Sequence, residues 1–299
     1  MAPLIEFRDV SVHFPAPRGL SDWLCRRPHQ NVRAMDCVNI SVERGEIHAI
    51  VGESGSGKST LARVATRLQM PTQGRVLMNG EDVTFLRSRV ELRDYRRRVQ
   101  MIFQDPFSSI NPSQTIFDYV AEPLIVNGMY GCAQSLAEKV HGTLASAGLR
   151  PAELFAQRYP NELSGGQRQR AVIAGALVME PKLVIADEPV SMLDVSVSAE
   201  IIKLMLQLRV SRGLAYIFIT HDLHLAAAIA DRVSVMREGR IIEAGLPGDV
   251  LKKPSEDYTR QLLASAPTLN EALDRRAARV SYASGLNRPM PSRGICKSE

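Results

Sequence analysis

The sequence predicts an α/β fold in which a mostly parallel sheet carries helices on both faces. Short buried-strand patterns alternate with helical patterns, for example Leu183–Ala186, then Val195–Arg209, then Ala215–Ile219. This alternation is typical of parallel strands that are connected by helices. A second observation is the stretch from Ile116 to about Tyr159, which has helical spacing and no strand-like run. It predicts a helical subdomain inserted into the α/β core.

The remaining elements follow from local patterns in chain order. Leu4–Phe14 alternates near its end and predicts a strand, and Glu46–Val51 is an apolar run of the buried-strand type. Asn79-Gly80 lies between apolar residues and predicts a hairpin. The other expected elements are the helices Lys58–Leu68 and Ser164–Met179, the hairpin Gly74–Val83, the strand Val99–Phe103, an irregular insertion over 15–31 and a tail after Pro254.

The composition is that of one large or two modest globular domains with a sizeable core. Among 299 residues, 45% are hydrophobic and 23% are charged, which argues against bulk disorder. The formal net charge of +5 suits phosphate ligands or an anionic membrane surface. It is too weak and too dispersed to indicate DNA binding by itself.

The four cysteines are scattered and form no C-x-x-C pair, which favours a reducing cytoplasm over a disulfide framework or a zinc site. Residues Met1–Val10 lack the basic and apolar runs of a signal peptide. The longest apolar stretch, Ala171–Met179, is much shorter than the about 20 residues of a spanning helix. We therefore expect that the chain does not cross a membrane and that any role across one requires partner subunits.

Residues 52–59 read Gly-Glu-Ser-Gly-Ser-Gly-Lys-Ser and match the phosphate-loop pattern G-x-x-x-x-G-K-[ST]. The match lies between a predicted strand and a predicted helix, which is the context that the pattern requires. Glycines let the backbone wrap around phosphate oxygens, and the helix N-terminus presents unpaired amides. We predict that Lys58 bridges the β- and γ-phosphates and that the Ser59 hydroxyl binds Mg²⁺. The predicted nucleotide-binding residues of this loop are Gly52, Ser54, Gly55, Gly57, Lys58, Ser59 and Thr60, and Lys58 is also predicted to be catalytic.

A second glycine-rich segment, Leu163-Ser164-Gly165-Gly166-Gln167, has similar physical features. Ser164 is a helix-capping residue and the two glycines expose backbone amides, so the segment predicts a second anion site. It resembles the signature sequence of ABC ATPases. The resemblance implies that Ser164, Gly165, Gly166 and Gln167 close over an ATP molecule held by a partner cassette. Two chains would then sandwich two ATP molecules.

Two carboxylates follow the buried-strand pattern of residues 183–186. Asp187 and Glu188 stand at the expected carboxyl end of this strand, where α/β sheets bind ligands. The segment resembles the Walker B strand and the catalytic glutamate of ABC ATPases. The resemblance implies that Asp187 holds Mg²⁺, directly or through water. Glu188 would orient and polarise the attacking water as a general base.

Four further positions acquire a role from the same resemblance. Gln104 follows a predicted strand and resembles the Q-loop glutamine, a contact to Mg²⁺ and water. Asp194 belongs to a segment that resembles the D-loop, which crosses to the partner cassette. His221 resembles the switch histidine that contacts the γ-phosphate and is predicted to be catalytic. Phe14 resembles the A-loop aromatic that stacks on adenine, although an apolar residue at a strand end is usually part of the core.

The motifs occur in the order of an ABC cassette: phosphate loop, Q-loop, signature, Walker B, D-loop and switch histidine. Over about residues 4–265 the chain therefore resembles a P-loop NTPase ABC cassette. That resemblance implies a RecA-like core with a mixed sheet, an inserted α-helical subdomain and a C-terminal tail. We expect the ATPase domain to span residues 1–253, with the helical subdomain at about 104–163. Residues 254–299 would form an extension of the oligopeptide-transporter type, with a disordered end.

Several stretches resemble the oligopeptide, dipeptide and nickel importer ATPases. They are Ile102–Phe107, Arg158–Pro160, Asp187–Ser191 and Pro254–Pro267, the last with Tyr258-Thr259 and Leu262-Leu263. The insertion after Phe14 is similar to one in one of the two paired ATPases of those importers. The resemblance implies ATP and Mg²⁺ as cofactors and a location at the cytoplasmic face of the cell membrane. The implied partners are integral membrane permeases, a second ABC ATPase subunit in a heterodimer and, indirectly, a solute-binding protein, with no nucleic acid.

These motifs do not identify the transported solute. Peptides are the first expectation, with nickel, glutathione or another small solute as alternatives. A non-transport ABC ATPase of translation or DNA repair would usually carry two cassettes in one chain or a long coiled-coil insertion. A P-loop kinase or GTPase would lack the signature and the switch histidine.

Two positions depart from the family pattern. Gly175 stands where the family usually has arginine in the helix after the signature, and Met192 replaces a smaller D-loop residue. Neither is a phosphate ligand. The stretch from Arg87 to Arg98 holds six arginines. It is either a solvated basic face or a contact for anionic lipid or a permease loop.

Overall fold

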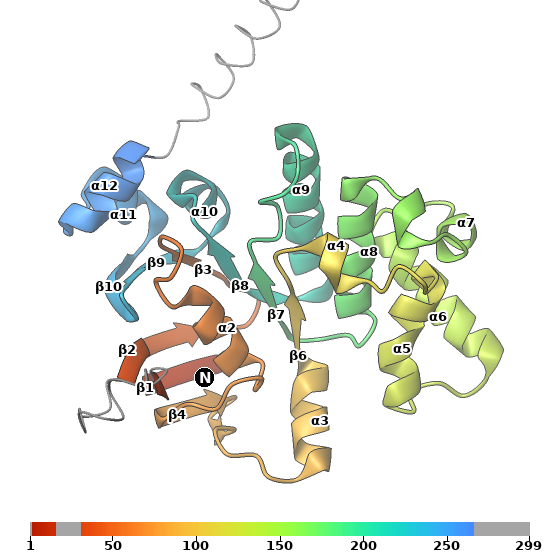
Figure 1. The fold of residues 1–299 in the computed structure, drawn as a ribbon, viewed down its shortest axis with the longest axis horizontal. Helices are drawn as coiled ribbons and strands as arrows, with labels where there is room; N and C mark the ends of the chain where they lie inside the picture. Colours follow the sequence, from red (N-terminus) through yellow and green to blue (C-terminus); the bar gives the residue numbers. More distant parts are fainter. Residues whose placement is uncertain (1, 16–30, 266–299) are drawn as a thin grey trace, which may run out of the picture.

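The computed structural model describes residues 2–15 and 31–265, which form two sheets and a set of helices (Figure 1). Nearly all of the predicted insertion over 15–31 lies outside the described residues. The chain beyond residue 265, including the end that we expect to be disordered, lies outside them as well.

The larger sheet carries the predicted parallel core. Its strands are β3 (Ile47–Val51), β6 (Val99–Ile102), β7 (Leu183–Asp187), β8 (Ala215–Thr220), β9 (Arg232–Arg237) and β10 (Arg240–Gly245). They lie in the order β10-β9-β3-β8-β7-β6, and only the β9–β10 pair is antiparallel. Every residue of β3, β7 and β8 is buried because this sheet is covered on both faces. Their carboxyl ends lie at one edge, since Val51 pairs with Thr220 and Asp187 with Ile219.

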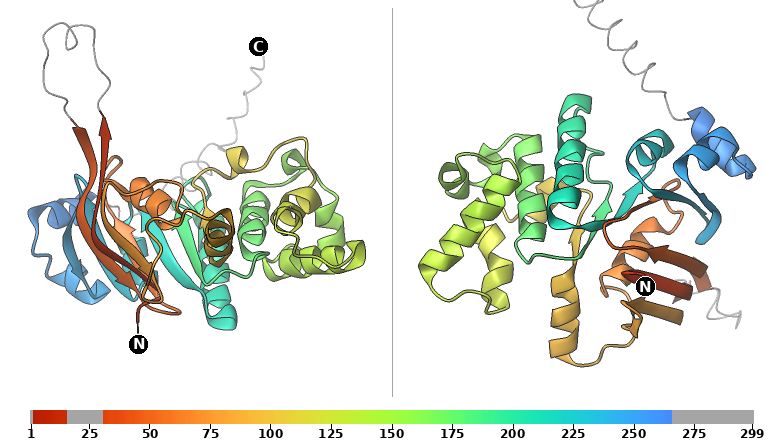
Figure 2. Two further views of the ribbon diagram at one scale, coloured as in Figure 1. Left: turned by 90° about the horizontal axis from the view of Figure 1, so that it is seen from below. Right: turned by 180° about the vertical axis from the view of Figure 1, so that it is seen from behind.

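The strands of the smaller sheet are antiparallel. Figure 2 shows this sheet beside the rest of the molecule. Its strands, in the order β2-β1-β4-β5, are β1 (Ile5–Pro15), β2 (Asn31–Val42), β4 (Gln73–Met78) and β5 (Glu81–Asp82). Asn79 and Gly80 both have positive φ, 53° and 85°, at the turn between β4 and β5. That geometry suits a two-residue hairpin and confirms the hairpin predicted from Asn79-Gly80.

The helices fall into two groups. A group that follows β6 lies at one end of the molecule (Figure 1). It consists of α4 (Pro106–Ser109), α5 (Ile116–Val126), α6 (Ala133–Ser146), α7 (Ala152–Ala156), a 3-10 turn (Pro160–Glu162) and α8 (Gly165–Leu177). The others are α2 (Lys58–Ala65), α3 (Arg89–Arg98), α9 (Val195–Arg212), α10 (Leu223–Ile229), α11 (Pro247–Lys252) and α12 (Asp257–Ser265).

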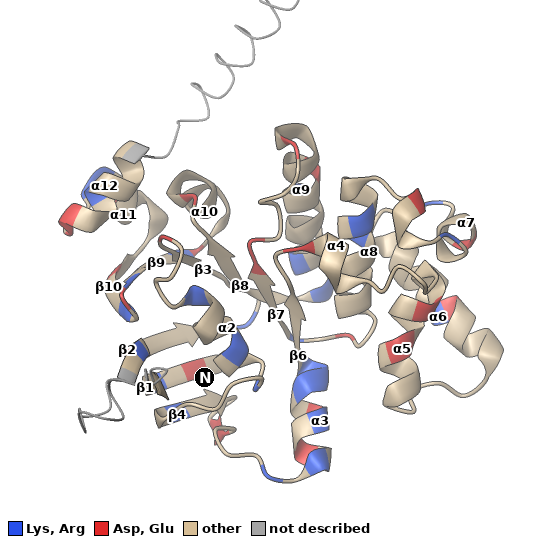
Figure 3. Cartoon of the chain, viewed as in Figure 1, with Lys and Arg blue, Asp and Glu red and all other residues tan. Residues whose placement is uncertain are grey.

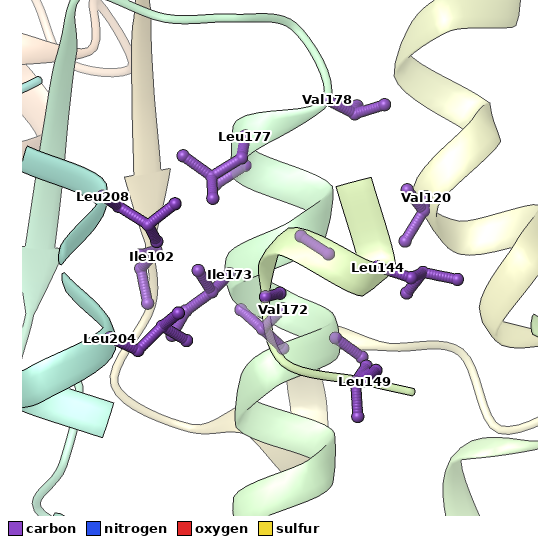
Figure 4. Close-up of a cluster of buried hydrophobic side chains, with 14 of the residues drawn as sticks. Ile102, Val120, Leu144, Leu149, Val172, Ile173, Leu177, Val178, Leu204 and Leu208 are labelled. Atoms are coloured by element: carbon purple, nitrogen blue, oxygen red, sulfur yellow. The ribbon is translucent and has the colours of Figure 1, made fainter. Parts of the chain in front are cut away.

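Helix α8 joins the helical group to the sheet. Figure 4 shows its side chains Val172, Ile173 and Leu177 between Leu204 and Leu208 of α9 and the side chains of α5 and α6. All of these residues are buried in one hydrophobic cluster. Burial of a single Leu-sized side chain is worth about 2 kcal/mol, so the two parts are strongly packed at this contact.

Close packing in this contact explains why residue 175 is glycine. A Cβ atom at Gly175 would come 2.6 Å from Cε1 of Tyr119, so a larger residue would displace that ring from α8. Burial raises the pKa of Tyr119 to about 12. The departure from the family pattern therefore makes room for an aromatic side chain of α5.

Helix α3 was not predicted as a helix because only Tyr95 of its ten residues is buried, so the apolar periodicity is missing. Its arginines line the helix in Figure 3. Ser88 and Glu91 form a capping box at its start, and this box rather than an apolar periodicity marks the helix in the sequence.

The expectation of a tail after Pro254 also needs correction. Helix α12 buries Tyr258 and Leu262 and is part of the packed domain.

Candidate functional site

The phosphate-loop match lies where it was predicted, between β3 and α2. Gly55 and Gly57 have φ values of 83° and 108°, which side-chain-bearing residues rarely adopt. A Cβ at Gly52 would lie 2.2 Å from the carbonyl oxygen of Met236, so glycine is required there by close packing. The N-cap Gly57 provides no side-chain cap, which leaves the first amides of α2 available to an anion.

Lys58 folds back over its own loop. Its Nζ atom donates hydrogen bonds to Gly52 O and Glu53 O, both at 2.7 Å, and to Ser56 Oγ at 3.3 Å. The residue is only 5% exposed, and burial lowers the pKa of its ammonium group, while the charges of Glu188 and Asp187 oppose that shift. The positive charge of Lys58 therefore lies close enough to Asp187 and Glu188 to interact with their carboxylates.

Asp187 ends strand β7 and is 7% exposed. Burial raises the pKa of its carboxyl group, and the charge of Glu188 raises it further, whereas a hydrogen bond from Ser59 and the charge of Lys58 lower it. The structure therefore brings together two of the predicted metal-binding residues, Ser59 and Asp187. It presents them as a hydroxyl and a carboxylate oxygen.

Glu188 stands at a strained position in the turn that follows β7. Its φ is 47°, in the left-handed region that non-glycine residues rarely occupy. Its N–H donates to Ile219 O of β8 at 3.0 Å, and its carbonyl accepts from Ser191 Oγ at 3.1 Å. The backbone is therefore held in this unusual conformation from two sides.

Two predicted residues, Gln104 and His221, lie against the carboxylate of a third, Glu188. Gln104 Nε2 donates to Glu188 Oε2 at 3.0 Å, and His221 Nδ1 lies 3.4 Å from the same oxygen. Gln104 follows β6, Glu188 follows β7 and His221 follows β8, three adjacent parallel strands. His221 is 62% exposed, so this cluster lies at the surface of a single chain.

The glycine-rich start of α8 is well formed but separate. Ser164 Oγ accepts from the N–H of Gln167 at 3.3 Å, and Gln167 Oε1 accepts from the N–H of Ser164 at 3.1 Å. This capping box confirms the predicted helix cap. Within residues 2–15 and 31–265, no hydrogen bond joins these residues to the phosphate loop.

The remaining predicted residues lie in the phosphate loop, beside the signature segment or on β1. Asp194 is the exposed N-cap of α9, and Leu193 before it lies 3.4 Å from where a Cβ of residue 165 would be. Ser54 is exposed in the phosphate loop, and Thr60 lies in the first turn of α2. Phe14 is half exposed on β1, opposite Val32 of β2, and forms no described contact with the phosphate loop.

The motif-bearing part of the chain matches a known protein family. The family model described as ABC transporter matches residues 35–191, which include the phosphate loop, the signature segment and both carboxylates. The chain belongs to the ABC transporter family. As a member of this family it is an ATPase of the ABC type.

ABC relatives with curated functions match nearly the whole chain. The oligopeptide transport ATP-binding protein AppF of Bacillus subtilis is 44% identical over 264 residues, which cover 88% of this chain and 78% of AppF. The dipeptide transport ATP-binding protein DppF of Escherichia coli is 40% identical over 289 residues, which cover 96% of this chain and 83% of DppF. The chain therefore falls in the oligopeptide and dipeptide group of ABC ATP-binding proteins.

A solved ABC cassette has the same fold. The dimeric structure of the ATP-binding cassette MJ0796, in a post-hydrolysis state with ADP and phosphate, matches 81% of this chain and 98% of its own chain. The TM-score is 0.69 and the sequence identity is 28%. This similarity confirms the predicted ABC cassette fold, a mixed α/β sheet with an antiparallel subdomain.

The ABC motifs of this chain fit ATP and Mg²⁺. The cradle at Gly52 and Gly57 has no space for a Cβ, and no side chain caps the amides at the start of α2. Ser59 and Asp187 supply the hard oxygen donors that Mg²⁺ prefers. Among the described residues no group of three or more His, Cys, Asp or Glu side chains forms a metal site.

The described helices include none that is both long enough and apolar enough to pass through a lipid bilayer.

One contact of the site was missed by the motif analysis. Tyr258 of α12 accepts a hydrogen bond from the N–H of Glu53 in the phosphate loop, at 2.9 Å. The Tyr258-Thr259 pair was noticed as a resemblance, but only the folded chain shows what this tyrosine touches.

Proposed function

We propose that this chain is the ATP-hydrolysing subunit of an importer that takes up di- or oligopeptides. The observation that supports ATP hydrolysis by these residues is the meeting of Gln104, Glu188 and His221 at the ends of three parallel strands. The peptide substrate is supported by the transport functions named for AppF and DppF.

We infer a division of labour among the residues of the site. Lys58 and the amides of α2 bind the β- and γ-phosphates and stabilise charge on the transferring phosphoryl group. Glu188 orients and polarises the attacking water, while Gln104 and His221 hold its carboxylate in place. Bound Mg²⁺, held by Ser59 and Asp187 with Gln104 nearby, would neutralise phosphate charge. Phe14 stacks on adenine in this proposal.

We propose that the site is completed by a second ATPase subunit. The start of α8 at Ser164–Gln167 is capped, yet in the part of the chain that the structure describes no hydrogen bond joins it to the phosphate loop. The dimeric state of MJ0796 supports this arrangement. Asp194, in the segment before α9, crosses to the partner, and a sister subunit would make the pair a heterodimer.

We further propose that ATP binding closes the two cassettes and that hydrolysis reopens them. The helical subdomain, about residues 104–163, transmits this closure to integral membrane permeases. A solute-binding protein delivers the substrate to those permeases, and the chain is peripheral at the cytoplasmic face of the membrane. Co-purification of the chain with integral membrane subunits tests this assembly, and its absence from every membrane complex would contradict it.

The substrate is tested by uptake. A strain that lacks this chain is complemented with the wild type or with Glu188→Gln and is given labelled dipeptide, oligopeptide, glutathione or nickel. We expect only the wild type to restore peptide uptake. Peptide uptake that is unaffected by loss of the chain, together with loss of glutathione or nickel uptake, would replace peptide by that solute.

A further inference from the structure

Tyr258 of α12 contacts the phosphate loop from the other end of the sequence. The N–H of Glu53 donates a hydrogen bond to Tyr258 Oη at 2.9 Å, across 205 positions. Tyr258 is 6% exposed and packs in a cluster that contains Val51, the last residue of β3. The guanidinium carbon of Arg237 lies 4.9 Å from the centroid of its ring. The phenol is therefore held in one place, with its oxygen against the loop.

The bound amide belongs to the same peptide unit that holds Lys58. The carbonyl of the Gly52–Glu53 peptide accepts a hydrogen bond from Lys58 Nζ at 2.7 Å. In a trans peptide, which this one is, the N–H and C=O groups are coplanar and point in opposite directions. An amide held toward Tyr258 therefore directs the carbonyl toward Lys58. One rigid unit links the tyrosine to the lysine.

Helix α12 is anchored independently of this contact. The carboxylate of Glu243 on β10 accepts hydrogen bonds from the N–H groups of Ser255 and Glu256, at 2.8 Å and 3.3 Å, just before α12 begins. Leu262 is buried in the same cluster as Tyr258. Figure 1 shows α12 beside α11, at the opposite end of the molecule from α5, α6 and α7. The helix is thus a firm support from which a side chain can position the loop.

We propose that Tyr258 is a positioning residue for ATP binding. It orients the Gly52–Glu53 peptide, and through that peptide it sets the position of the Lys58 ammonium group and the curvature of the phosphate loop. The proposal gives the C-terminal extension a direct effect on polyphosphate affinity. It rests on the proposed role of Lys58 as a phosphate ligand.

The test uses the full-length chain with Tyr258→Phe, which removes the phenol oxygen and keeps the ring. We expect the Kd for Mg·ADP, measured by titration calorimetry, to rise about three- to tenfold, the factor that one net hydrogen bond supplies. The KM for ATP should rise by a similar factor with kcat close to the wild-type value, because a loop that binds ground state and transition state alike changes KM alone.

Tyr95→Phe is the matched control. The Tyr95 hydroxyl is fully buried and donates to Ala65 O at 2.5 Å, at the end of α2 away from the loop. This variant should lower the unfolding midpoint and leave the Kd for Mg·ADP unchanged. If Tyr258→Phe binds Mg·ADP like the wild type, or if Tyr95→Phe weakens binding equally, the proposal is wrong.

A third variant separates this proposal from the one on which it rests. Lys58→Ala should bind Mg·ADP much more weakly than the wild type. If it binds equally well, the role of Lys58 is wrong. If Lys58→Ala is weakened and Tyr258→Phe is not, only the role of Tyr258 is wrong.

Discussion

The phosphate loop and the signature segment are both glycine-rich starts of helices, but they differ in what surrounds them. The phosphate loop follows a buried strand, wraps around the buried Lys58 and is contacted by Tyr258 from α12. The signature segment carries its own capping box at Ser164 and Gln167. The atoms nearest to a Cβ built at Gly165 or Gly166 belong to the apolar side chains of Leu193 and Val197.

The two signature glycines also differ from each other. A Cβ at Gly166 would lie 2.5 Å from Cγ1 of Val197, whereas a Cβ at Gly165 would only touch Leu193 at an ordinary 3.4 Å. The fold of one chain therefore explains Gly166 and leaves Gly165 unexplained. A ligand that approaches the backbone at Gly165 would supply the missing reason. The difference fits the proposed arrangement, in which the phosphate loop is built by its own chain and the signature segment completes the site of a partner.

The strongest test removes the chemistry and leaves both glycine-rich regions intact. Glu188→Gln should lower ATP turnover about a thousandfold, because the general base is lost while the amide remains similar in shape. Bound ATP should persist and hold the subunits as a stable dimer, visible by size-exclusion chromatography. Glu81→Gln, which alters an exposed carboxylate of β5, is the control and should turn over normally. Wild-type turnover in Glu188→Gln would refute the role of Glu188.

Gly165→Ala tests the proposed partner contact of the signature segment alone. The methyl group has room within the chain, so the unfolding midpoint and the Kd of the isolated chain for Mg·ADP should not change. ATP turnover should fall about a hundredfold, because the added methyl group would keep the partner-held phosphates away from one preorganised backbone donor. Gly142→Ala in α6, where nothing lies within 4 Å of the new Cβ, is the control. Full turnover in Gly165→Ala would show that this segment grips no nucleotide.

Gly166→Ala tests the packing of the same segment. The clash with Val197 should lower the free energy of unfolding by about 1–2 kcal/mol, since stiff side chains must shift. Combining it with Val197→Ala should cost less than the sum of the two single changes, as denaturant unfolding can measure. Additive effects would contradict the contact.

The smallest effect concerns the strand that supports the phosphate loop. His48 of β3 is 4% exposed, with Nδ1 3.1 Å from Ser41 O and Nε2 2.8 Å from Ser234 Oγ, partners that satisfy a neutral ring. Burial lowers the pKa of His48 and the charge of Arg232 lowers it further; together they outweigh the hydrogen bond to Ser41 O and the charge of Glu46, which raise it. A lowered pKa leaves stability unchanged above the usual value of 6.5 and reduces it below, because only the unfolded chain then takes up the proton.

We therefore expect urea unfolding between pH 6.5 and 5.5 to show a loss of up to about 1.4 kcal/mol, the limit for one group per pH unit. His48→Gln should reduce that loss. The pKa of the neighbouring Glu46 lies in a lower pH range. Although burial raises its pKa, the hydrogen bond from Arg232 lowers it overall, so its contribution is lost only below pH 4.5. An unchanged pH dependence in His48→Gln would exclude His48 as the source.

Much of the fold could be predicted where one strong local signal marks an element. Buried runs marked β3, β7 and β8, and Asn79-Gly80 marked the turn between β4 and β5. Elements without apolar periodicity were missed. In α3 arginines surround a single buried tyrosine, and the β9–β10 turn at Glu238-Gly239 lacks the usual Asn or Asp before glycine.

The sequence by itself determined the chemistry of this protein, because phosphate loops, helix caps and strand-end carboxylates depend on a few neighbouring residues. Only the tertiary structure decided which of them act together. Gln104, Glu188 and His221 meet because parallel pairing aligns the ends of β6, β7 and β8. Tyr258 reaches Glu53 because α12 packs against the cluster that contains Val51. Contacts between distant segments depend on the packing of whole elements, and no local pattern records that.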